Sequence, residues 1–541
     1  MLQNIRTLIH ANLNSLQISN AFYWSEKAYR LSKDEEDIYW YAYMLQTTGQ
    51  YKRAYFILSN VKNIQKKTRC WYLKAVALFE TKEYKEALEL LEEDLLSENS
   101  FNSTFNPYEQ LDQKQLGYDM DIKQNINMES LVFLLKGKIY QAMDCFEIAK
   151  KHFLLSLYHD ITNHEALEIL IKYCFIKEKE SEHLLKKILD ELNKELPINK
   201  DNKTFKQMIL IIYKKQFGLD KVDLNIKNEN PDIKVITDFD QEIHKAKKLF
   251  YSCFFEECYD LLKELLKVDK FNADTLTLCI SCHYQMNNIK ELFKLSHELI
   301  SSLPTLALSW YSISCYYMLL EKVELARFYL NKSLSYDKLF SPSWLLLGHS
   351  YSLISEQDQA ISTYLHTLKF LQNCHLPYLY VGLEYSAMNN HKIALDFILH
   401  SSKLCLDDPV VLHELGVVAY KSNMINLAWD YLHAALKYVQ KAYAYPKTLS
   451  SYWEILYTNL GHVARKLKKH EDSIIYFNKA LLLNPKSCST YTALGLAYSL
   501  KFETNKAIEM FTEGLVLNND DVICNGMINF LIEKLADQEK F

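Results

Sequence analysis

The chain has 541 residues, of which 49% are hydrophobic and 13% aromatic, whereas glycine and proline number only 11 and 9. This composition suits dense helix packing and excludes a disordered or fibrous chain. The 62 basic and 67 acidic residues give a formal net charge of -5, which is too small to indicate nucleic acid or an anionic membrane as a partner.

The N-terminal segment lacks the features of a secretory signal. Polar residues interrupt residues 1–20 every few positions, and nowhere is there an apolar run of about 18 residues, the length that spans a bilayer. Most of the 12 cysteines lie in apolar helical patterns, where thiols serve as small buried hydrophobes. The sequence therefore predicts a soluble intracellular protein without a disulfide framework.

The N-terminal part, residues 1–217, carries a repeated pattern of small and aromatic residues with some drift. Its period is about 34 residues, which is typical of tetratricopeptide (TPR) helix pairs. The residues that keep the phase are Gly49 and Ala54, then Trp71, Ala75 and Ala87, then Gly137, Tyr140, Ala149 and Phe153. Residues 97–125 are rich in Asn, Ser, Gln and Asp, and they predict a loop or disordered insert between two of these units.

Residues 218–239 break the pattern and predict a linker or bend, after which residues 240–541 repeat it closely. Gly348, Gly382 and Gly416 are equally spaced, and Gly461 and Gly495 resume the interval after a slip within residues 441–454. Residues 520–535 predict one further helix that covers the end of the array. We therefore expect an all-α fold, a TPR superhelical solenoid whose function is binding.

The recurring residues have a packing role in this interpretation. Glycine inside a helix costs about 1 kcal/mol relative to alanine, so its return at position 8 of each repeat predicts a close crossing of the two helices. Aromatic residues at position 4 are expected to fill the space between successive pairs. The predicted packing residues are Gly348, Gly382, Gly416, Gly461, Gly495, Trp310 and Trp344.

Positions 2, 5, 6, 9, 12 and 13 of the first helix of each repeat project away from the packing positions, and we expect them to line a concave groove. Such a wall of mixed polar and apolar side chains suits an extended or helical peptide, and Asn459 can pair with a ligand's main chain. We call these residues the inner-wall set: Leu345, His349, Leu379, Leu383, His413, Glu414, Val417, Tyr420, Asn459, His462, Arg465, Lys466, Thr492 and Leu496.

Motifs for cofactors and catalysis are weak or missing from the sequence. Cys279, Cys282 and His283 match the CxxCH pattern of c-type haem attachment, but they lie in a helix of a chain without an export signal, so buried packing is the preferred interpretation. No second ligand pair for zinc, Gly-rich phosphate loop, HExxH or GxSxG motif is found. We expect no cofactor, no metal and no enzymatic activity.

Several segments go beyond the general repeat consensus, and in the same order they resemble the TPR scaffold subunit of the anaphase-promoting complex, or cyclosome, of the cell-division-cycle sixteen type. The resemblance extends over nearly the whole chain. The segments that carry it are 21–27, 37–40, 135–140, 374–390, 413–420 and 459–469.

The resemblance implies a non-catalytic arm of a multisubunit ubiquitin ligase that controls mitotic progression and exit, in the nucleus and cytoplasm. It implies a homodimer formed by the N-terminal repeats, contacts with other TPR subunits, and a C-terminal superhelix that encloses a small accessory subunit of the cell-division-cycle twenty-six type.

Two other readings compete with this one. The first is a TPR co-chaperone adaptor that clamps the acidic C-terminus of a heat-shock protein; of the Lys and Asn set that such a clamp needs, only Asn459, Arg465 and Lys466 are present. The second is an enzyme with a TPR arm, which would need a catalytic domain that the sequence does not contain.

Overall fold

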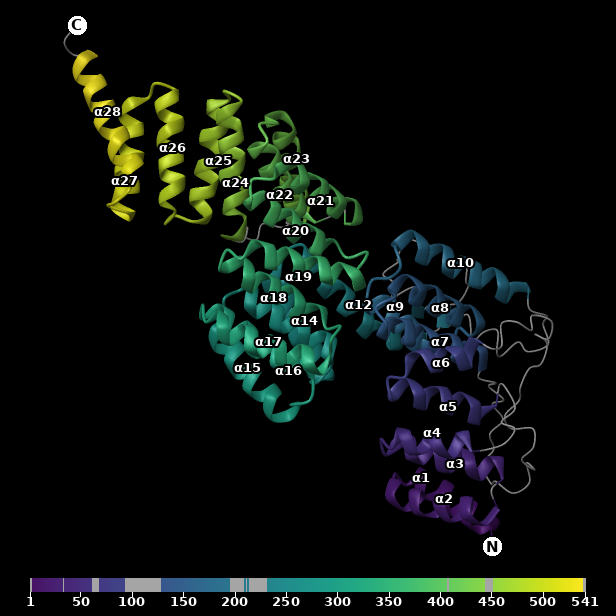
Figure 1. Ribbon diagram of the computed structural model, residues 1–541. Coiled ribbons are helices and arrows are strands. Elements are labelled where there is room, and N and C mark those ends of the chain that lie inside the picture. The colour runs from purple at the N-terminus through teal and green to yellow at the C-terminus, as the bar shows by residue number, and fades with distance from the viewer. Residues whose placement is uncertain are drawn as a thin grey trace. The chain divides into compact units, whose positions relative to one another are not determined.

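The computed structural model describes residues 2–32, 34–60, 68–92, 128–194, 209–210, 212–213, 231–405, 408–442 and 451–538. The chain divides into two compact units, residues 1–227 and 228–541. Within each unit the helices stack as consecutive antiparallel pairs (Figure 1), and no strand occurs in the described ranges. The prediction of an all-α TPR solenoid is confirmed, and we call the two helices of each pair helix A and helix B.

The first unit contains ten labelled helices in the described part of residues 1–227. They are α1 (Leu2–Asn14), α2 (Ile18–Ser32), α3 (Glu35–Thr47), α4 (Tyr51–Ser59), α5 (Arg69–Glu80), α6 (Tyr84–Glu92), α7 (Met128–Ala142), α8 (Phe146–His159), α9 (His164–Lys172) and α10 (Glu178–Lys194). The predicted insert at 97–125 lies outside the described residues.

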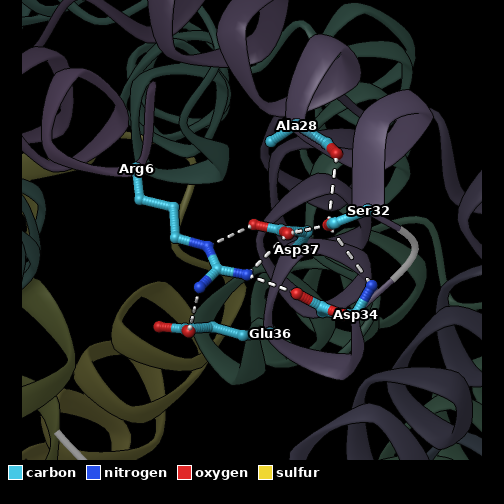
Figure 2. Close-up of polar contacts among 6 residues, drawn as sticks. All are labelled: Arg6, Ala28, Ser32, Asp34, Glu36 and Asp37. Atoms are coloured by element: carbon cyan, nitrogen blue, oxygen red, sulfur yellow. Dashed lines mark hydrogen bonds and ion pairs between the residues drawn. The ribbon is translucent and has the colours of Figure 1, made fainter. Parts of the chain in front are cut away.

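A network of ionic hydrogen bonds joins α1 to the start of α3 (Figure 2). Arg6 makes a bidentate contact with Asp37, with Nε 2.9 Å from Oδ1 and Nη2 2.8 Å from Oδ2. Arg6 Nη2 also lies 2.8 Å from Asp34 Oδ2, and Ser32 donates to Asp37. Asp37 is only 1% exposed; burial opposes its ionisation, but the hydrogen bonds from Arg6 and Ser32 outweigh burial and lower its pKa.

The second unit begins with α12 (Pro231–Tyr251) and ends with α28 (Val522–Gln538). Between them lie α13 (Phe255–Val268), α14 (Ala273–Gln285), α15 (Ile289–Ser302), α16 (Ala307–Leu319), α17 (Val323–Tyr336), α18 (Ser341–Leu353), α19 (Gln357–Phe370), α20 (His375–Ala387), α21 (His391–Leu404), α22 (Pro409–Lys421), α23 (Ile425–Ala442), the short 3-10 helix η1 (Ser451–Trp453), α24 (Glu454–Lys466), α25 (His470–Leu483), α26 (Cys488–Leu500) and α27 (Thr504–Leu517).

The predicted linker at 218–239 is not irregular throughout. Residues 231–239 are the first turns of α12, and residues 218–230 lie outside the described ranges. Pro231 was predicted to lie in the linker. It stands instead at the first position of α12, where a fixed φ is favourable and no N–H is needed. The slip at 441–454 is taken up in part by α23, which is 18 residues long where α21 has 14.

The five regularly spaced glycines of the second unit lie at close helix crossings, as their spacing predicts. A Cβ built on Gly416 would lie 2.5 Å from Leu432, and one on Gly495 would lie 2.7 Å from Phe511, each on helix B of the same repeat. Gly348, Gly382 and Gly461 face Tyr364, Ile398 and Phe477 in the same way, and Gly137 faces Phe153 in the first unit. Ordinary contacts between two carbon atoms begin at about 3.5 Å, so only the hydrogen of a glycine fits at these crossings.

The two predicted packing tryptophans lie within their own repeats. Trp310 stacks on Tyr329 and Tyr336 of α17 and donates from Nε1 to the carbonyl of Pro304 at 2.9 Å. Trp344 contacts His366 of α19 and donates to the carbonyl of Lys338 at 2.7 Å. They therefore join helix A to helix B of one pair. The prediction that they fill the space between successive pairs is not what the structure shows.

Each helix A of the second unit ends in a turn with one left-handed residue. At Ser355, for example, φ is 63°, and the next N–H, of Glu356, donates to the carbonyl of Tyr351 at 3.0 Å, which is the bond of a Schellman motif. Glycine is usual at this place and occurs at Gly49 of the first unit. The corresponding residues of the second unit are Cys253, Asn287, Glu321, Ser355, Asn389, Asn423, Lys468 and Phe502.

The last helix, α28, covers the final pair as predicted. Cys524 and Leu531 of α28 are buried against Ala507 and Phe511 of α27. Among the residues that the structure describes, none of the helices has the length and apolar character needed to cross a bilayer.

Candidate partner-binding surface

The inner-wall set lies on α18, α20, α22, α24 and α26, the A helices of consecutive pairs. Most of its members are half-buried, and Lys466 is exposed. Half-buried side chains on one face of successive helices can contact a bound chain while they remain held by the repeat packing. The half-buried members are Leu345, His349, Leu383, Glu414, Val417, Tyr420, Asn459, His462, Arg465 and Leu496.

Three of the four members at position 5 of their repeats are buried, whereas the fourth, Leu345, is half-buried. Leu379 is 2% exposed, His413 9% and Thr492 7%. Position 5 is three residues before the glycine at position 8, so both lie on the same helix face, and neighbouring side chains cover that face at Leu379, His413 and Thr492. The assignment of Leu379 and Thr492 to the groove wall is therefore wrong.

Two members on α26 pack against the end of the array. Thr492 donates to Asp521 Oδ2 at 3.1 Å and lies 3.1 Å from Cys524 Sγ of α28. Leu496 packs on the cluster that includes Phe511 and Leu531. The α26 residues thus fasten the terminal helix.

A chain of polar contacts crosses from α22 to α24 at the centre of the set. His413 Nδ1 lies 3.0 Å from Glu414 Oε1, and His413 Nε2 lies 2.8 Å from Nδ2 of Asn459. His413 was predicted to point freely into the groove; instead its ring is buried and occupied on both nitrogens. Asn459 stays half-buried.

One turn farther along α24, the cationic members also have neighbours. Arg465 Nη2 lies 3.4 Å from His462 Nδ1, and Lys466 Nζ lies 4.5 Å from the centre of the Tyr420 ring. Burial, together with Arg465, lowers the pKa of His462 to about 4, so this histidine is neutral near pH 7. Two of the residues that resembled a co-chaperone clamp, Arg465 and Lys466, therefore already have neighbours within the protein.

An aromatic cluster joins α18, α19 and α20, and the sequence predicted only one of its three members. The Tyr364 hydroxyl is 2.8 Å from His349 Nδ1, and the His349 ring meets Tyr380 edge-on at 4.4 Å. Burial lowers the pKa of His349 to about 4. Tyr380 stands at position 6 of its repeat, which is one of the inner-wall positions, so a stricter application of the rule would have found it.

The second unit also contacts itself across many repeats. Residues 251–255, from the last residue of α12 to the first residue of α13, form what we call the closing turn. Tyr251 meets the His375 ring of α20 at 5.3 Å, and Phe255 meets Tyr452 at 6.0 Å. Cys253 is buried in the cluster of Trp453 and its neighbours, where burial and nearby Asp408 raise its pKa to about 12. The array therefore curves far enough for its first pair to touch later repeats.

The CxxCH motif has the packing role that we expected. Cys279 and Cys282 are buried on α14 in one hydrophobic cluster with Cys258. Within the described ranges, no group of three or more His, Cys, Asp or Glu side chains is arranged to hold a metal ion. The surface offers aromatic faces, neutral histidines and a half-buried amide, which suit recognition of a peptide main chain.

Comparisons with known proteins agree over nearly the whole chain. The human protein named "Cell division cycle protein 16 homolog" is 32% identical over 545 residues, which cover 100% of this chain and 86% of that protein. "Anaphase-promoting complex subunit 6" of Arabidopsis thaliana is 29% identical over 536 residues, covering 98% of this chain and 96% of the plant protein.

A solved structure and two family models match as well. The structure titled "Crystal structure of APC/C hetero-tetramer Cut9-Hcn1" has a TM-score of 0.74 and 25% identity, and the match covers 98% of this chain and 96% of that chain. The family model "Anaphase-promoting complex, cyclosome, subunit 3" matches residues 14–94. The model "Tetratricopeptide repeat" matches residues 307–338 and 455–487.

Proposed function

The chain belongs to the family that includes cell division cycle protein 16 and anaphase-promoting complex subunit 6, and on this premise we propose that it is a non-catalytic TPR scaffold subunit of the anaphase-promoting complex. The observation that carries the proposal is the family likeness along the full length of the chain. In this role the protein contributes to mitotic progression and exit by holding other subunits in place. Its proposed location is the nucleus and the cytoplasm.

Purification of the native tagged protein tests this role. We expect it in a large assembly together with cullin-like and RING subunits, identified by mass spectrometry. Recovery of the protein only as a free monomer or dimer would contradict the proposal. Recovery with a heat-shock protein through that protein's acidic C-terminus would favour the co-chaperone adaptor instead.

We further propose that the second unit captures a small accessory subunit of the cell-division-cycle twenty-six type along its A helices. Support comes from the half-buried residues of α22 and α24, which can contact a bound chain, and from the likeness to a structure whose title names a second protein, Hcn1. A Val417→Arg substitution places a charge among these residues and should abolish co-purification of the small subunit, because burying an unpaired charge is costly.

The matched control introduces the same charge elsewhere. Phe328 on helix B of an earlier repeat is 63% exposed, so Phe328→Arg should leave capture unchanged. Equal loss in the two variants would show that capture does not depend on the A helices of the second unit. Both variants need unchanged helicity, measured by circular dichroism.

The homodimer is proposed for the first unit. Its support is a set of apolar side chains that the described helices leave exposed, which is typical of interaction surfaces; they include Tyr23, Leu31 and Phe56. Sedimentation of the purified chain at micromolar concentration should give a dimer, and substitution of Tyr23 and Phe56 by Asp should give a monomer. A wild-type chain that sediments as a monomer would refute this part.

A further inference from the structure

The Asn459 side-chain amide is oriented by two residues of α22. A carboxylate only accepts hydrogen bonds, and Glu414 Oε1 lies 3.0 Å from His413 Nδ1. Nδ1 therefore carries the hydrogen and donates it to Glu414. In the neutral imidazole the other nitrogen, Nε2, is then an acceptor.

This tautomer decides which end of the Asn459 amide faces His413. The structure places Nδ2 of Asn459, the NH2 donor, 2.8 Å from His413 Nε2, which matches Nε2 as the acceptor. The opposite orientation has nearly the same shape but would place Oδ1 against the lone pair of Nε2, two acceptors facing each other. The pair of Glu414 and His413 thus selects one of the two amide orientations.

The selected orientation leaves the amide oxygen available. Asn459 is half-buried, and its Oδ1 has no hydrogen-bond partner among the residues that the structure describes. An acceptor held in one direction on a binding surface costs little further ordering when a ligand arrives. The complementary group on a peptide is a main-chain N–H that its own structure does not use, as in an extended segment or the first turn of a helix.

We propose that Glu414 and His413 are positioning residues that hold Asn459 with Oδ1 presented to a main-chain N–H of the captured chain. The proposal rests on capture of a small accessory subunit by the second unit. It makes Asn459 specific for an N–H donor, so the captured chain must not have proline or an N-methylated residue at the matching position.

A double-mutant cycle on the full chain tests the positioning role. The probe is the small subunit recovered with the native complex, made as a synthetic peptide, and its Kd is measured by calorimetry. Asn459→Ala should weaken binding about tenfold, the value of one hydrogen bond. His413→Phe keeps the ring but removes the acceptor, and it should weaken binding in the wild-type background yet have no effect in the Asn459→Ala background. Equal weakening in both backgrounds would mean that His413 acts only through packing, and it would overturn the proposal.

A scan of the peptide tests the specificity directly and does not depend on the fold of a variant at position 413. Single N-methylation at successive main-chain nitrogens should reveal one position where wild-type protein loses about tenfold in affinity and the Asn459→Ala variant loses nothing. If no such position is found although the unmodified peptide binds normally, the positioning role is refuted and the proposed capture of the small subunit is not. Failure of the wild-type protein to bind the unmodified peptide would refute both.

Discussion

Gly461 on α24 provides a sharp test of the packing in the repeats. A Cβ at this position would lie 2.5 Å from Phe477 Cε1 and 2.7 Å from its Cδ1 and Cζ. The ring would have to move by about 1 Å to reach an ordinary carbon contact, and Phe477 is completely buried. Overpacking of this kind costs about 1–3 kcal/mol, whereas alanine gains about 1 kcal/mol over glycine inside a helix.

Gly526 on α28 is the matched control, because a Cβ there would meet nothing within 4 Å. Gly526→Ala should stabilise α28 by up to about 1 kcal/mol. The stability change that Gly461→Ala causes in α24 should be less favourable than this gain by the overpacking cost of about 1–3 kcal/mol. Hydrogen exchange of the α24, α25 and α28 amides on the full chain measures both effects, because repeat arrays open locally.

A second background separates the clash from other effects of Gly461→Ala. Phe477→Ala removes the ring, so Gly461→Ala made in that background should stabilise α24 by about the helix-propensity gain. If Gly461→Ala stabilises α24 with the Phe477 ring present, as Gly526→Ala stabilises α28, the close helix crossing does not constrain position 8 and the reasoning fails.

Three further predictions concern the ionic network, the turns and the closing turn. Arg6→Met removes the ionic partner of buried Asp37 and should destabilise α1 by up to about 3 kcal/mol near pH 7, measured by hydrogen exchange. Since the folded-state pKa of Asp37 is lowered, its contribution is complete above the unfolded value of about 3.9 and is lost as pH falls through the lower folded value; an acid titration that shows loss only as pH rises would contradict this. Ser355→Gly relieves a left-handed residue with φ of 63° and should raise the local stability of α18 and α19 by about 0.5–1 kcal/mol, while Ser355→Val should lower it; the same thermal midpoint for both would count against strain at this turn. Phe255→Ala should cost about 1–2 kcal/mol and lower exchange protection in the closing turn and at the start of α24 together, whereas exposed Phe328→Ala should change neither; loss confined to the closing turn would refute the long-range contact.

The repeat register could be deduced from the sequence because its cause is local and recurs. Gly348, Gly416 and Gly495 mark helix crossings whose partner, at position 24 of the same repeat, is sixteen residues away in every case, and the structure places a large side chain against each. The family also followed from sequence, since residues beyond the consensus matched it along the chain. A Pro at 231 was harder to place, because proline suits both a break and the first turn of a helix.

The binding surface was less predictable, since burial on helix A depends on neighbours that periodicity does not specify. Position 5 was assigned to the wall by its angle alone, yet Leu379 and Thr492 face neighbouring helices and are buried. The contact between His413 and Asn459 joins residues that are 46 positions apart, across a slip in the repeat, so no spacing rule indicated it.

The sequence by itself determined the helical repeat, the places where only glycine fits, and the family, because each depends on residue types at fixed short separations. Only the tertiary structure decided which side chains of helix A stay accessible, how Glu414 and His413 orient Asn459, and that residues 251–255 meet α20 and η1. Those features depend on the curvature that accumulates over many repeats, and small rotations between successive pairs set that curvature without a signature in any single repeat.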